Sequence, residues 1–172
     1  MMVLRIVLLC LSALALTGCV LQSGTPLYDD TSSVLALGTR GGAAKLASRI
    51  EGKWVPEKEA ITIKVVGKHY EVTSGTSTVA LNFVKLKGST YVVQGRESGK
   101  AAAYMLGNVT NGIAEVRPIA CTDIKAEASL AKWVEHDKDD CFVKPGPPPE
   151  KLFTAISKLG GEATSRIEIA AQ

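Results

Sequence analysis

The chain is poor in the side chains on which most hydrolytic active sites depend. Its 172 residues include only two histidines, His69 and His136, and neither a Gly-x-Ser-x-Gly nor a His-Glu-x-x-His motif occurs. Histidine is the side chain that most often transfers protons near neutral pH, so its scarcity argues against acid–base catalysis. Ser129 and Lys132 form a Ser-x-x-Lys pair, but the Ser-Asp-Asn and Lys-Thr-Gly elements that accompany a catalytic pair of this kind are missing. We therefore predict a protein without enzymatic activity, with a hydrolase as a remote alternative.

Charge of one sign is nowhere concentrated enough to define a polyanion-binding surface. Lysine and arginine number 20 against 17 acidic residues, and no basic stretch is interleaved with aromatic side chains, so we expect no nucleic-acid partner. Asp137, Asp139 and Asp140 form the densest acidic cluster, but Lys138 interrupts it, and the glycine and distal glutamate of a calcium loop are missing. We predict a solvated turn there, and neither a metal ion nor another cofactor in the protein.

Long apolar runs are also missing, except at the N-terminus. Residues 6–16 contain no charged side chain and follow a short segment whose single positive charge is Arg5. This layout is typical of a secretory signal, and the run is too short to span a bilayer as a helix. It ends in the sequence Leu16-Thr17-Gly18-Cys19.

These four residues resemble the lipobox of bacterial lipoproteins, in which a cysteine becomes the first residue of the mature protein. The resemblance implies that residues 1–18 are a signal peptide and that Cys19 carries a diacylglycerol on its sulfur, so that the membrane is one partner of the protein. Each buried CH₂ contributes roughly 0.8 kcal/mol, so two or three acyl chains form a stable anchor. Val20 stands where many Gram-negative lipoproteins retained in the inner membrane have aspartate, which implies the outer membrane, facing the periplasm. The alternative is an ordinary signal peptide with a chance cysteine.

Cysteine is scarce, and each of the four has a distinct expected fate. Cys10 leaves with the signal peptide and Cys19 is consumed by lipidation, so Cys121 and Cys141 remain. An even pair in an oxidising compartment predicts a disulfide. Closing a loop of about 20 residues stabilises a fold by roughly 3 kcal/mol. The alternative, a metal or thiol site, lacks a Cys or His partner at ligand spacing, since His136 stands alone before Cys141.

Composition divides the expected mature chain into two parts. Residues 19–46 contain clusters of serine, threonine, glycine and aspartate that favour turns and disorder. We therefore predict a lipid-anchored flexible tether over residues 19–46 and a single β-rich globular domain over residues 47–172.

From about residue 49, apolar and polar residues alternate between short turns, of which Asn111-Gly112 is a typical two-residue hairpin turn. Short connections require antiparallel neighbours, so the sequence predicts a mainly β (α+β) fold built on an up-and-down meander of about seven to eight strands. We expect the meander to curl or to form a barrel, and closure stays open at this point. The expected strands cover residues 53–55, 61–65, 69–73, 79–86, 90–94, 102–109 and 113–116.

After Pro118 the alternation weakens. Asp123 is placed to begin a helix that extends to about residue 131, and residues 132–136 and 141–144 are expected to form a hairpin. Pro147-Pro148-Pro149 then precedes a helix whose apolar stripe ends at Gly160-Gly161. Residues 163–170 are expected to be the final strand.

Gly52-Lys53-Trp54 at the start of the meander, with a late helix and a last strand, resembles the lipocalin layout. In lipocalins a Gly-x-Trp opens the first strand and the tryptophan closes one end of the barrel, often against an arginine. The resemblance implies that Trp54 is buried at one end of the sheet, with Arg49, Arg96 or Arg117 as its partner. It also implies a small apolar ligand inside the barrel.

Two classes of function follow. We predict a non-enzymatic binding or interaction module of the cell envelope, which would fill its core and use its outer surface for a protein partner. The alternative is a lipocalin-like carrier of a small apolar ligand, which would need an unfilled apolar interior. The sequence identifies no ligand-binding residue for either class.

Overall fold

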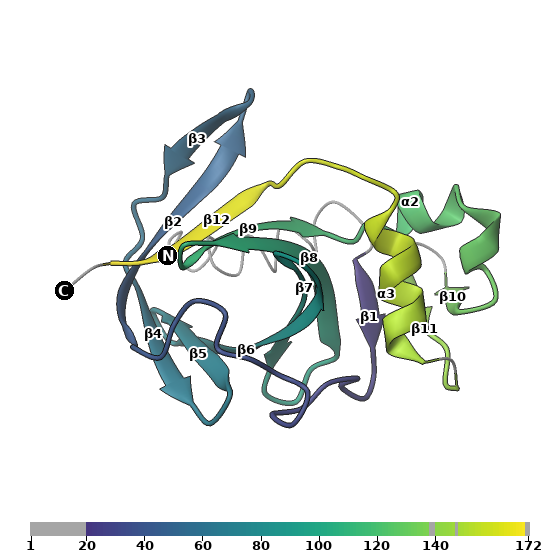
Figure 1. Cartoon of the computed structure of the whole chain (residues 1–172), viewed down its shortest axis with the longest axis horizontal. Helices are drawn as coiled ribbons and strands as arrows, with labels where there is room; N and C mark the ends of the chain where they lie inside the picture. The colour runs from purple at the N-terminus through teal and green to yellow at the C-terminus, as the bar shows by residue number, and fades with distance from the viewer. Residues whose placement is uncertain (1–19, 138–139, 147, 171–172) are drawn as a thin grey trace.

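Eight antiparallel strands close into a barrel in the computed structural model, which describes residues 20–137, 140–146 and 148–170 (Figure 1). Each strand pairs with two neighbours, and the first barrel strand returns to pair with the last. The predicted mainly β fold, with its antiparallel meander, C-terminal helix and final strand, is confirmed, and the sheet closes. In ring order the strands are β2 (Gly42–Ile50), β4 (Ile61–Val66), β5 (His69–Ser74), β6 (Ser77–Lys87), β7 (Thr90–Glu97), β8 (Ala102–Thr110), β9 (Ile113–Pro118) and β12 (Ser165–Ile169).

Alternating side chains separate the inside of the barrel from its outside. Ile61 and Ile63 of β4 are buried while the residue after each is exposed, because successive side chains of a strand point to opposite faces. Tight turns keep neighbouring strands antiparallel. At the β8–β9 turn, Asn111 (φ 52°) and Gly112 (φ 76°) both adopt the left-handed conformation, as a type I′ hairpin requires.

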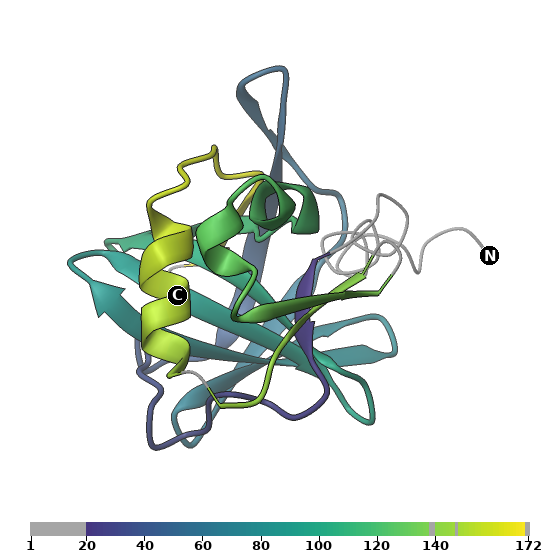
Figure 2. The same ribbon diagram turned by 90° about the vertical axis from the view of Figure 1, so that its right-hand side faces the viewer.

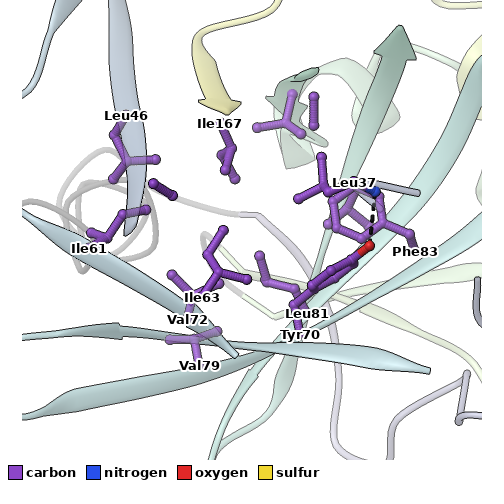
Figure 3. Packing of buried hydrophobic residues seen from close by; sticks show 14 of the residues in the cluster. Leu37, Leu46, Ile61, Ile63, Tyr70, Val72, Val79, Leu81, Phe83 and Ile167 are labelled. Atoms are coloured by element: carbon purple, nitrogen blue, oxygen red, sulfur yellow. Dashed lines mark hydrogen bonds between the residues drawn. The ribbon is translucent and has the colours of Figure 1, made fainter. Parts of the chain in front are cut away.

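The interior of the barrel is filled by the protein's own side chains (Figure 3). Tyr70 and Phe83 meet edge to face, with ring centroids 5.7 Å apart. Leu37, from the segment before β2, also belongs to this interior cluster and is 6% exposed. The Leu37 amide donates to the Tyr70 hydroxyl at 2.9 Å, and that hydroxyl donates to the Gly38 carbonyl at 2.8 Å. The segment before β2 is thereby bound to the barrel core.

A second apolar core lies on the outer face of β7 and β8, under the helix α3 (Pro149–Ser157) (Figure 2). Leu152, Phe153 and Ile156 of α3 are fully buried in this core. Phe153 packs against Tyr104 of β8 with ring centroids 5.2 Å apart. Among the residues that the structure describes, no helix is long and apolar enough to cross a bilayer. The other elements around this core are β1 (Leu21–Ser23), α2 (Cys121–Lys125), η1 (Ala128–Leu130), β10 (Val134–Asp137) and β11 (Asp140–Val143).

The predicted disulfide between Cys121 and Cys141 is present, and both cysteines are fully buried in the second core. It joins the start of α2 to β11, which pairs in parallel with β1. The hairpin predicted before and after residues 137–140 is present as β10 and β11. The helix predicted over residues 123–131 is instead divided into α2 and η1.

The prediction of a flexible tether over residues 19–46 is wrong for its described part, residues 20–46. Leu21 is fully buried, and β1 pairs with both β8 and β11. Further along, Asn82 donates to the Ser33 hydroxyl at 2.9 Å, and Leu37 enters the barrel. The domain therefore begins at or before Val20 rather than at residue 47. The small polar clusters form turns, which reverse the chain so that its few apolar residues reach the core.

Candidate functional site

The predicted lipidation site, Cys19, and the signal peptide 1–18 lie outside the described residues. The next residue, Val20, is buried and forms an isolated antiparallel bridge with Ala120.

Trp54 does not close the barrel, so this expectation is wrong. Its strand, β3 (Lys53–Pro56), pairs with the end of β2 in a hairpin that projects from the barrel (Figure 1). Trp54 is there only partly buried, and its flanking residues are exposed. Arg49 is the one of its three proposed partners that lies beside it, with the guanidinium carbon 5.9 Å from the ring centroid. The reason is that β3 pairs with residues 47–50 of β2, beyond residues 42–44, which pair with the barrel strand β4.

His69, one of the two candidate proton-transfer residues, holds the N-terminal segment to the barrel. Its Nδ1 lies 2.7 Å from a carboxylate oxygen of Asp30, and the Lys68 amide donates to the other oxygen at 3.2 Å. These hydrogen bonds to the ionised form keep the pKa of Asp30 below its usual value. A cavity of about 490 Å³ adjoins the pair, lined also by Asn82, Gln94 and Arg96.

Most polar groups beside this cavity form hydrogen bonds within the protein. Gln94 accepts from the backbone amides of Leu27 and Tyr28 and donates to the Tyr28 carbonyl, as a neighbouring strand would. The Tyr104 hydroxyl hydrogen-bonds Ser23 at 2.5 Å. We therefore interpret this region as the attachment of residues 23–33 to the barrel.

The other candidate residues do not converge. Lys132 places its ammonium 4.5 Å from the ring centroid of Trp133, while the Ser129 amide hydrogen-bonds Glu127. His136 is exposed on β10, in register with Cys141. Asp137 and Asp140 face each other at the end of the β10–β11 hairpin, and Asp139 lies outside the described residues. Within the described ranges, no three His, Cys, Asp or Glu side chains gather as metal ligands would.

A larger cavity lies outside the barrel, between α3 and the strands, and we call it the α3 groove. It has a volume of about 640 Å³. One wall is the last turn of α3 with the loop that follows it, and the floor is the outer surface of β6, β7, β8 and β9. Arg49 from β2 completes the rim. The lining residues are Arg49, Leu86, Lys87, Thr90, Leu106, Gly107, Asn108, Glu115, Arg117, Thr154, Ser157, Lys158, Gly160, Gly161 and Ala163.

The α3 groove is predominantly basic. Arg49, Lys87, Arg117 and Lys158 line it, against the single lining carboxylate of Glu115. Burial lowers the pKa of the Arg117 guanidinium, an effect that nearby Asp123 partly offsets. A guanidinium is not deprotonated in proteins, so the Arg117 side chain keeps its positive charge. The groove therefore carries positive charge, part of it on the half-buried side chains of Arg49 and Arg117.

Strand pairing explains why basic residues far apart in the sequence meet here. β12 pairs with β2 on one side and with β9 on the other, and this brings Arg49 and Arg117 to the same outer surface. On β9, the buried Ala114 and Val116 point inward, so Glu115 and Arg117 point outward. That alternation was the available sequence signal. It could not be connected with Arg49, because the pairing of β2 was not predicted.

Comparison with known proteins adds no assignment. No family model, no curated protein and no solved structure matches the chain. The function is therefore argued from the residues and their geometry.

Proposed function

We propose that this protein is a lipid-anchored lipoprotein of the bacterial cell envelope, held in the outer membrane and facing the periplasm, that acts as a non-enzymatic binding or interaction module. The observation that carries the proposal is the filled barrel. Carrier proteins need an apolar cavity of roughly 300–1,000 Å³ to enclose a small ligand. Here fifteen buried residues from the strands and the preceding segment form one continuous cluster in the interior. A partner or ligand would then bind to the outer surface of the domain.

The interior cluster is closed by a specific contact. Leu37 packs among the barrel residues, and its backbone is hydrogen-bonded to Tyr70, which is itself fully buried. A ligand entering the barrel would have to displace both the leucine and these hydrogen bonds. Each such bond contributes about 1 kcal/mol, and burying a leucine contributes roughly 1.5–3 kcal/mol. These contributions favour the filled state over a carrier.

The discriminating experiment is a ligand screen on the mature protein. Fatty acids and other small apolar molecules should leave the melting temperature unchanged, because a molecule that does not bind the native state does not stabilise it. Native mass spectrometry of protein purified from its own envelope should find no co-purified fatty acid or other small apolar molecule of the kind that a carrier would enclose in its barrel. A saturable one-to-one shift of the melting temperature would contradict the proposal.

The lipid anchor has its own test, with a control inside the same signal peptide. Cys19→Ser should abolish fatty-acid incorporation, and no mature membrane-bound form should be produced. Cys10→Ser should leave both intact, because the lipobox cysteine alone receives the lipid. Labelled palmitate and membrane fractionation at high salt measure the two outcomes. Continued labelling of the Cys19→Ser variant would refute the assignment.

A lipocalin-like carrier is the second candidate, and the closure of the barrel favours it. Eight strands give an interior just wide enough either to be filled by side chains or to hold one small ligand. In a carrier, the segment around Leu37 would have to leave the mouth of the barrel. The same apolar-ligand screen decides between the two candidates.

A further inference from the structure

Two residues that line the α3 groove each have a hydrogen-bond donor with no acceptor among the residues that the structure describes. Nε of Arg49 and Nη2 of Arg117 are buried from solvent and make no hydrogen bond. Buried donors are nearly always paired, because an unpaired one loses its hydrogen bond to water without a replacement. Both guanidinium groups belong to residues that line one cavity, so a ligand rich in acceptors would pair these donors once the two side chains shift to face it.

Side chains from β6, β7, β8 and the end of α3 supply the complementary chemistry. Lys87 is the last residue of β6, and Lys158 is the C-cap residue of α3. The hydroxyl groups of Thr90 and Ser157 and the amide of Asn108 line the same space. Phosphate groups bind to such sets of arginine, lysine and hydroxyl donors, because a phosphate offers several strong acceptors and up to two negative charges.

The loop after α3 is shaped to reach the Arg117 guanidinium. Gly161 adopts a φ of +111°, and a Cβ at this position would lie only 3.2 Å from Nη1 of Arg117. Glycine therefore lets the loop backbone pack directly on this side chain. The contact restrains the Arg117 side chain at the groove wall, whereas an arginine on an open surface would move freely.

Three acidic groups lie near the groove. Glu115 lines it, Asp123 acts on Arg117 electrostatically, and Glu162 pairs with Arg49 at 3.6 Å. The Glu162 side chain is 76% exposed, and such surface pairs contribute little because water screens them. The last carbonyl groups of α3 add a partial negative charge that Lys158 opposes. An arriving phosphate can replace Glu162 as the partner of Arg49.

We propose that the α3 groove binds a phosphate group of a ligand, with Arg117, Arg49 and Lys158 as its principal contacts. This inference rests on the proposed function, since it names the chemistry that the outer surface of the module recognises. A phospholipid headgroup and a soluble phosphate ester share this chemistry. The leucines of the lining, Leu86 and Leu106, provide apolar surface beside the charges and suit the body of either ligand.

The test uses the mature lipidated protein in neutral detergent micelles. Pyrophosphate is titrated against potassium chloride at equal ionic strength, and in a second arm phosphatidylglycerol is added to the micelles in place of a diacylglycerol, which lacks the phosphate. We expect a saturable rise in melting temperature in at least one arm. A response to pyrophosphate assigns a soluble ligand, and a response to phosphatidylglycerol alone assigns a lipid headgroup.

Variants with opposite expected effects separate binding from folding. Arg117→Ala and Lys158→Ala should each weaken binding about tenfold, or about 1.4 kcal/mol, because each removes a hydrogen bond between charged groups. Glu162→Gln should strengthen binding, since it removes the competing carboxylate from Arg49, and a folding defect cannot produce that result. Lys64→Ala, on the exposed face of β4, is the matched control and should bind as the wild type does.

The outcomes also separate this inference from the proposed function. No saturable response in either arm, or an unchanged affinity in Arg117→Ala, would overturn the phosphate site while leaving the interaction module in place. If a fatty acid binds one-to-one in parallel titrations and phosphate does not, both the groove assignment and the filled-barrel proposal fail.

Discussion

Leu37→Ala tests whether the segment before β2 is part of the barrel core. Leu37 is 6% exposed within the interior cluster, although it lies outside any strand. Removing three carbon groups forfeits about 2.4 kcal/mol of burial, at roughly 0.8 kcal/mol for each. The remaining cavity adds a further cost that depends on how far the segment collapses into it. We expect a total loss of about 3 kcal/mol.

The comparison is made with Val34→Ala in the same segment. Val34 is 39% exposed, and its backbone amide donates to the Phe83 carbonyl, a bond that the substitution leaves intact. Its expected cost is within about 0.5–1 kcal/mol. Urea unfolding at constant m-value measures both losses. The Leu37 variant should also melt about 6–12 °C lower, at roughly 2–4 °C per kcal/mol for a domain of this size.

A ligand rescue gives the same prediction a second readout. The cavity left by Leu37→Ala is lined by apolar side chains, and a dry apolar cavity of this kind binds benzene or xenon. Benzene should therefore raise the melting temperature of the variant and not that of the wild type. If Leu37→Ala unfolds no more easily than Val34→Ala and gains nothing from benzene, the segment does not fill the barrel and the reasoning is refuted.

Three further outcomes are expected. Replacing both Cys121 and Cys141 by alanine should cost about 3 kcal/mol through loop entropy, and free thiols in peptide maps of the native protein would refute the pairing. Gly67→Ala and Gly75→Ala both place a side chain at positive φ, at a cost of about 1–2 kcal/mol. Gly67→Ala should cost measurably more in urea unfolding, because its Cβ would lie 2.2 Å from the carboxylate that packs against the β4–β5 turn, whereas open space surrounds the other glycine. Trp54→Ala should lower the free energy of unfolding by less than about 1.5 kcal/mol, since this side chain lies on the projecting hairpin, and a loss of 3–5 kcal/mol would show that it is core.

The strands that could be predicted from alternating apolar and polar residues are those with one strongly apolar face. Ile61, Ile63 and Val72 are large and inward-facing, so the period of two was visible in their segments. β2 was missed because its inward positions include Ala44 and its sequence begins with glycine and alanines, a composition shared with linkers. Since β2 pairs with β4 and β12, it is the strand that closes the ring. Closure was therefore beyond the reach of the pattern.

The candidate site was hidden for a related reason. Arg49 and Arg117 are separated by most of the meander, and only the pairing of β12 with both β2 and β9 brings them together. No local spacing encodes such a contact. The disulfide was accessible because its argument needs only a count of cysteines and a compartment. The Trp54 expectation failed because a short motif cannot show whether its strand lies in the barrel or in a projecting hairpin.

The position of β1 has a consequence for how the proposed lipoprotein would search for its ligand. A flexible tether over residues 19–46 would let the domain explore roughly 30 Å above the bilayer. Instead Val20 is already bridged to Ala120, so one peptide unit of about 3.8 Å separates a lipidated Cys19 from the folded domain. The domain would then move in two dimensions with the lipid that carries it and sample only the layer next to the headgroups. Its encounters would depend on density per unit of membrane area, and a ligand dissolved in bulk periplasm would have to come to it.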